Sequence, residues 1–126
     1  MDYRAKFVTE GNSASLQLIA GNAHLLVGRV VTVLGGAVLA EGSVLGKVTA
    51  SGKYKLTASA ANDGSEEPDL ILAEDVDASA GDKTAMAYER GDFNANAITL
   101  GAGHTLATVR EDLRAKGITL LPSVTA

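Results

Sequence analysis

The sequence predicts a small, mostly β domain with one short helix, and three observations lead to this fold class. Short runs of β-branched and apolar residues recur from residue 25 onward, separated by glycines and other turn residues. A single segment, residues 105–116, spaces its apolar residues at helical intervals. A chain of 126 residues has the length of one domain.

The strands are expected wherever such runs are bounded by turn signals. Gly35, Gly36 and Gly42 supply turns with positive φ between the first runs, because only glycine adopts that conformation at low cost. Residues 70–73 are wholly apolar, as in a strand covered on both faces. The expected strands are residues 30–33, 44–49, 53–57, 70–73, 84–88, 97–100 and 118–121.

The helix is expected to begin after Thr105 and to end before Gly117. Leu106, Val109 and Leu113 fall on one face. The Thr105 hydroxyl suits the N-cap, and Gly117 suits the left-handed residue that commonly follows a helix.

Residues 1–24 differ from the rest and are interpreted as a flexible N-terminal arm on a β-rich domain of residues 25–126. The arm is polar and has no sustained periodicity. Within it, residues 15–19 alternate like a half-formed strand. This segment is expected to pair either with an exposed sheet edge of another protein or with the chain's own sheet.

Composition excludes several classes of function. The chain has no cysteine, so disulfides and thiolate metal sites are excluded. Its formal net charge is −4 and its basic residues are scattered, which argues against a nucleic-acid partner. The longest apolar run, residues 30–40, contains a threonine and two glycines, and no secretory signal precedes it. We therefore expect no membrane partner and synthesis in the cytoplasm of a host cell.

Two segments imitate ligand-binding loops without matching them. Residues 42–47 lack the spacing and the following Ser or Thr of a phosphate loop, so a tight β-turn is expected. Residues 75–81 alternate oxygen ligands like a calcium loop, but Met86 occupies the place of the bidentate glutamate. An exposed acidic turn is the expected structure, and no metal or cofactor is expected.

Catalytic patterns are equally weak, so we do not expect an enzyme. Neither His24 nor His104 has a second ligand at metal-binding spacing, and His104 is expected to cap the helix or lie on the surface. Ser43 lacks the glycine pattern of a nucleophile elbow. The tripeptide at residues 90–92 matches an adhesion motif, but a turn after a strand ending at Tyr88 explains its glycine.

Four blocks in order resemble one known family. They are residues 40–54, 70–78, 88–94 and 113–118. Together they resemble the head decoration proteins of tailed bacteriophages, the family of the capsid-stabilising protein of phage lambda. The resemblance runs from about Val30 to Leu121.

The resemblance implies a single domain of the β-clip type and a structural role without a cofactor. Three subunits are expected to form a homotrimer on the outer surface of the expanded icosahedral head, at local threefold sites. There the trimer binds the major capsid protein and stabilises the shell against the pressure of packaged DNA. In the family an N-terminal segment becomes ordered on the capsid, so the arm's large apolar residues are our candidate capsid contacts: Tyr3, Phe7, Leu16, Leu18 and Ile19.

Two alternatives remain open from the sequence. One is another β-rich interaction module of a phage or bacterium, such as a tail or spike accessory protein. The other is a lipoyl-like carrier domain modified at Lys83, because residues 81–84 place this lysine in an expected exposed turn between β segments.

Overall fold

The computed structural model describes residues 18–21 and 26–121, and this part of the chain is mostly β with one α-helix, as the sequence predicts. Helix α1 is Leu106–Arg114, and a short 3-10 helix, Ala95–Ala97, follows the longest strand. The strands are β1 (Ile19–Gly21), β2 (Val27–Val33), β3 (Val38–Leu39), β4 (Val44–Lys47), β5 (Tyr54–Leu56), β6 (Pro68–Leu72), β7 (Val76–Asp77), β8 (Lys83–Asn94) and β9 (Ile118–Leu121).

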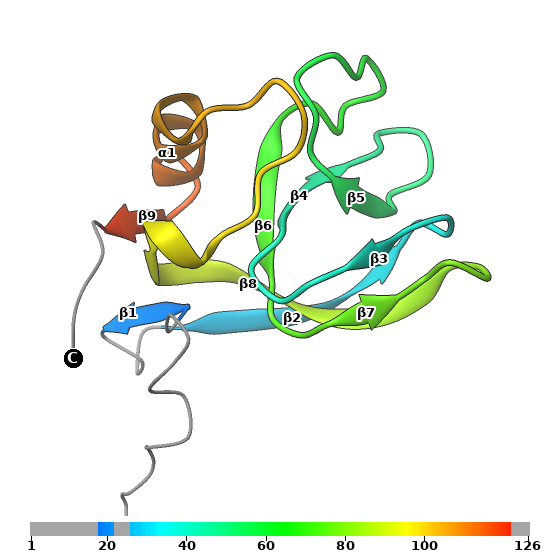
Figure 1. Ribbon diagram of the computed structural model, residues 1–126, viewed down its shortest axis with the longest axis horizontal. Helices are drawn as coiled ribbons and strands as arrows, with labels where there is room; N and C mark the ends of the chain where they lie inside the picture. Colours follow the sequence, from blue (N-terminus) through cyan, green and yellow to red (C-terminus); the bar gives the residue numbers. More distant parts are fainter. Residues whose placement is uncertain (1–17, 22–25, 122–126) are drawn as a thin grey trace, which may run out of the picture.

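Five of the strands close into a small barrel. They pair in the order β8, β2, β5, β4 and β6, and β6 returns to β8. The β2 and β8 strands are antiparallel along all of β2, whereas β2 and β5 are parallel and meet only at Val33 and Tyr54. The β3–β7 ribbon lies to one side of this barrel, and α1 with β9 lies to the other (Figure 1).

Two apolar cores lie on opposite faces of β6. Leu70 and Leu72 belong to the cluster inside the barrel, whereas Ile71 belongs to the cluster beneath α1. All three side chains are buried. The expected doubly covered strand at residues 70–73 is therefore confirmed, because alternate side chains of a strand face opposite sides.

Helix α1 begins and ends as predicted. Thr105 and Thr108 form a reciprocal capping box, with Thr108 N donating to Thr105 Oγ1 at 3.3 Å and Thr105 N to Thr108 Oγ1 at 3.2 Å. Val109 and Leu113 face the second core and are fully buried. Gly117 has a φ of +94°, which confirms the left-handed residue after the helix.

Two expectations between residues 88 and 100 are wrong. The predicted strand at 97–100 is replaced by the 3-10 helix and a single bridge from Thr99 to Ser43. The Asn94 side chain accepts a hydrogen bond from Asn96 N at 3.0 Å and so turns the chain at this point.

The predicted turn at residues 90–92 is wrong, because these residues lie within the second half of the long strand β8. Gly91 pairs with Ile118 of β9, and β1 pairs with the adjoining residues of β8. Gly91 has a φ of +149°, and a Cβ there would lie 2.5 Å from Leu26 Cδ2. Glycine therefore allows close packing within a continuous strand rather than a reversal of the chain.

Within the predicted arm, residues 18–21 are part of the chain's own sheet. Ile19 pairs with Phe93, and Asn94 N donates to the carbonyl oxygen of Leu18 at 2.7 Å. From the sequence, the alternating segment at residues 15–19 is expected to pair either with another protein or with the chain's own sheet. Its described end pairs with β8 of the chain's own sheet. Residues 1–17, 22–25 and 122–126, which include His24 and most of the predicted arm, lie outside the described residues.

Candidate interaction surfaces

The side chain of His104 stabilises two loops. Its Nε2 lies 2.9 Å from the carbonyl oxygen of Glu66 and 3.2 Å from Thr57 Oγ1. A carbonyl only accepts, so we assign the proton to Nε2. The buried Thr57 hydroxyl in turn donates to Ser65 O at 2.6 Å. His104 thus joins the loop before α1 to the loop before β6, and residues 18–21 and 26–121 contain no cluster of His, Asp and Glu suited to a metal ion.

The turn expected at the start of residues 42–47 is present. Ser43 N donates to Ala40 O at 3.1 Å, and Gly42 has a φ of +92°. A Cβ on Gly42 would lie 2.5 Å from Ala97 O, so the glycine also permits close approach of two chain segments. The turn leads into strand β4 rather than into a helix, and its role is structural.

The acidic segment around β7 uses its carboxylates to hold backbone groups. Asp77 Oδ1 accepts from the hydroxyl of Ser79 at 2.6 Å and from its amide at 3.0 Å, and these bonds lower the pKa of Asp77. Asp75 Oδ1 accepts from Glu41 N at 2.8 Å. Lys83 is exposed as expected, but its expected place in a turn is wrong, because it is the first residue of strand β8.

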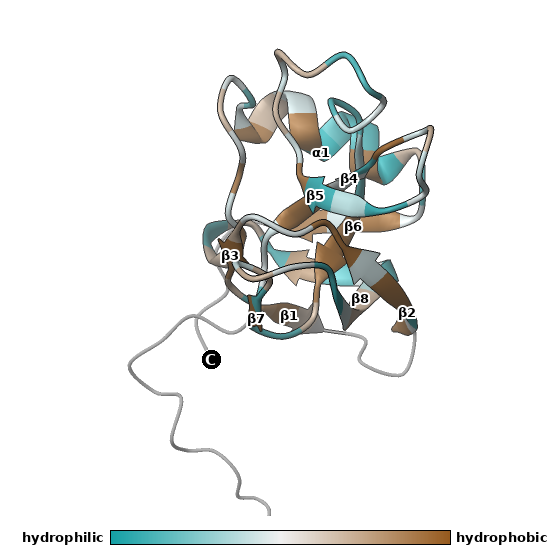
Figure 2. Ribbon diagram, turned by 90° about the vertical axis from the view of Figure 1, so that its right-hand side faces the viewer, coloured by the Kyte–Doolittle hydropathy of each residue, from teal (hydrophilic) through white to brown (hydrophobic). Residues whose placement is uncertain are grey.

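An apolar patch lies on the outer face of the barrel. Val30 and Met86 are directly opposite each other on β2 and β8, with 64% and 41% of their surface exposed. A Cβ on Gly28 would lie 3.1 Å from Met86 Sδ, so the methionine lies across this glycine. We call Val30, Met86 and Gly28 the outer patch. Figure 2 shows hydrophobic residues along β2.

The same strand has a free edge. One side of β2 pairs with β8, whereas the other side meets β5 only at Val33, and no described strand covers residues 27–32 there. Unpaired N–H and C=O groups on such an edge can bind an extended segment of another protein. The outer patch adjoins this edge, so apolar and hydrogen-bonding groups occur together.

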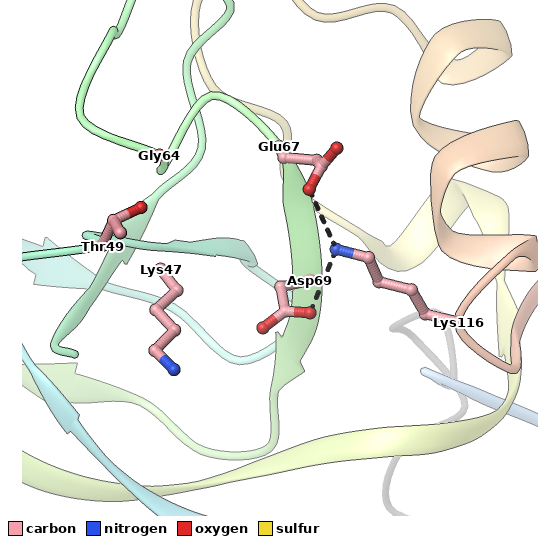
Figure 3. A pocket seen from close by; sticks show the side chains of 6 residues that line it. All are labelled: Lys47, Thr49, Gly64, Glu67, Asp69 and Lys116. Atoms are coloured by element: carbon pink, nitrogen blue, oxygen red, sulfur yellow. Dashed lines mark ion pairs between the residues drawn. The ribbon is translucent and has the colours of Figure 1, made fainter.

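A charged groove opens where β4, β6 and the end of α1 approach one another. It consists of two pockets of about 320 and 230 Å³ that share Asp69 and Lys116. Lys116 Nζ lies 3.2 Å from Asp69 Oδ1 and 3.6 Å from Glu67 Oε1 (Figure 3). The hydroxyl of Tyr54 donates to Asp69 Oδ2 at 3.2 Å, and burial together with the Asp69 charge raises the pKa of Tyr54.

The remaining charges of the groove fall into two groups. Arg29 and Glu89 form an ion pair of 3.6 Å. Lys47 lines one pocket and Arg90 the other, and neither forms an ion pair with any residue in the described ranges. Among the described residues, the groove therefore contains two cations, Lys47 and Arg90, that are available to an external anionic group.

The candidate capsid contacts chosen from the sequence are only partly described. Leu18 is buried in the second core and Ile19 is half-buried beside it. Tyr3, Phe7 and Leu16 lie outside the described residues. The outer patch could not be identified from the sequence. Residues 30–33 are all β-branched, so their pattern does not show which alternate side chains face outward.

Comparison with known proteins supplies the family. The model of the family of bacteriophage lambda head decoration protein D matches residues 7–118, which is most of the chain. The chain belongs to this family. The match confirms the resemblance noted in the sequence, although no curated protein matches the chain. These decoration proteins are structural proteins of the phage capsid rather than enzymes.

Their place on the capsid exterior implies the same location for this chain. None of the helices in residues 18–21 and 26–121 has the length and apolar character needed to cross a membrane.

Proposed function

We propose that the protein binds the exterior of the expanded phage head as a homotrimer at local threefold sites. There it ties neighbouring copies of the major capsid protein together and stabilises the shell against the pressure of packaged DNA. The family match over residues 7–118 is the observation that carries this proposal.

The described surface supports a binding role. The free edge of β2 and the outer patch offer backbone and apolar contacts, and the groove offers charged ones. A trimer that engages several sites gains effective concentration after its first contact, so modest affinity per subunit gives a long residence. Tight binding therefore does not require a deep pocket.

In this proposal the arm contributes capsid contacts, and its base is fixed to the domain. Tyr3, Phe7 and Leu16 are the proposed contacts with the capsid. Leu18 and Ile19 pack into the second core, so they hold the arm at the end of β8. A deletion that tests the arm should consequently stop before Leu18.

The test is co-sedimentation of the purified protein with heads that lack it, in expanded and unexpanded forms. We expect saturable binding to expanded heads only, and we expect a variant lacking residues 1–16 to fold normally but to lose binding. The thermal unfolding of the shortened chain, followed by circular dichroism, controls for folding.

Two results would contradict parts of this proposal. Full decoration by the shortened chain would show that the arm is dispensable. Failure of the intact protein to bind either head would refute the decoration role, and an intact-mass measurement would then examine Lys83 for a lipoyl-sized increment.

A further inference from the structure

The groove has four cations, and two of them, Lys47 and Arg90, form no ion pair with a residue that the structure describes. Lys116 is held between Asp69 and Glu67, and Arg29 is paired with Glu89. These contacts occupy the acidic residues that line the groove. Lys47 lines one of the two pockets and Arg90 the other, and neither forms an ion pair with a described residue.

Four acidic side chains gather elsewhere on the chain, in strand β7 and in the loops beside the β3–β7 ribbon. Asp75 Oδ1 accepts from Glu41 N, and Glu74 Oε2 accepts from Met86 N at 2.8 Å. The acidic group is exposed and forms no ion pair with a described residue. We call it the acidic edge: Glu41, Glu74, Asp75 and Asp77.

The acidic edge has the features of a contact surface as well as charge. Val38, which pairs with Asp77 across the ribbon, has 68% of its surface exposed. Hydrogen bonds from Ser79 lower the pKa of Asp77, so its carboxylate stays ionised to lower pH than an ordinary aspartate. An exposed apolar side chain among stable negative charges suits a partner surface that is positively charged.

Strand β6 separates the two surfaces. Asp69 of the groove lies near its first residue, whereas Glu74 and Asp75 follow its last, about 17 Å away if the chain is extended. Within the described residues, a single copy therefore presents cations without an ion pair in the groove and carboxylates without an ion pair at the acidic edge. A second copy offers the complementary charge to each.

We propose that the acidic edge of one copy binds the groove of the next, with its carboxylates beside Lys47 and Arg90. Because different surfaces of the two copies meet, the contact is head-to-tail, and such contacts form a ring when the rotation between copies closes. This inference rests on the proposed trimer, for which it specifies the contact between subunits.

Complementary charge is the reason for choosing a second copy as the partner. The chain has an excess of acidic residues, with a net charge of −4, so random contacts between copies are repulsive. Placing acidic side chains in the groove replaces that repulsion with attraction in one orientation. Charges at an interface mainly provide such specificity and orientation.

The test compares the trimerisation of the full chain with that of K47E and R90E by sedimentation equilibrium. If each contact weakens about threefold, as for a partly exposed ion pair, three contacts reduce the trimerisation constant about 30-fold. Trimerisation of the original chain should also weaken as salt rises. R114E is the matched control, because it makes the same change of charge on an exposed residue of α1, outside the groove.

A reversal of both surfaces provides the stronger test. We expect K47E/R90E and E41K/E74K each to trimerise poorly, and a chain with all four substitutions to regain trimerisation. Thermal unfolding of each variant checks that it folds. Undiminished trimers of K47E/R90E that still bind heads would overturn this inference but leave the proposed function standing. An original chain that neither trimerises nor binds heads would refute both.

Discussion

Replacing Leu113 with alanine should remove much of the stability that holds α1 to the sheet. Leu113 is 0% exposed and belongs to the core cluster that also contains Val109, Phe93 and Ile118. Truncation of a fully buried leucine loses the transfer free energy of the removed carbons and leaves a cavity, together about 2–5 kcal/mol. The helix spans only nine residues, so few neighbouring side chains can move into the cavity that the substitution leaves.

The expected loss in the free energy of unfolding is about 3 kcal/mol, a large part of the total for a domain of this size. Urea unfolding followed by circular dichroism measures it, with the protein concentration held constant because association also changes apparent stability. Leu106→Ala is the control on the same helix face, since Leu106 is only half-buried and should lose less. A loss below about 1 kcal/mol for Leu113→Ala would refute the packing described for α1.

Two further predictions concern polar contacts. Thr105→Ala should lower the free energy of unfolding by about 1 kcal/mol because it removes the N-cap of α1. Thr105→Ser keeps a hydroxyl at this position and should recover most of the loss. Equal stability of the alanine and serine variants would contradict this prediction. Hydrogen bonds from Lys55 and Ser65 hold the pKa of Asp63 far below its ordinary value, so the stability that this carboxylate contributes is complete above pH ~4 and is lost as pH falls. The difference in unfolding free energy between the original chain and Asp63→Asn should therefore shrink between pH ~4 and ~2, and a difference that is independent of pH would refute the assignment.

Much of the architecture follows from local sequence. The capped helix was predictable because Thr105, the spacing of Leu106, Val109 and Leu113, and Gly117 act within a few residues of one another. The apolar run at residues 70–72 likewise required a strand with both faces covered. Each signal depends on short-range geometry that a linear sequence displays directly.

Other features depend on contacts between distant segments. β8 continues past Tyr88 because β1 and β9, far apart in the sequence, both pair with its second half. The segment at 97–100 alternates like a strand but pairs with another segment at only one residue. Local hydrogen bonds of the preceding turn therefore set its conformation. Pairing partners decide such cases, and sequence periodicity does not identify them.

By itself, the sequence determined a mostly β domain with one capped helix, and its four ordered blocks determined the family. Tertiary structure decided which side chains became the interaction surfaces. Closing the barrel exposes Val30 and buries its neighbour Val31, and the packing of α1 against β6 brings Lys116 beside Lys47 and Asp69 in a single groove. The physical reason is that exposure and the pairing of charges depend on which surfaces meet in space, and residues far apart in the chain supply those surfaces.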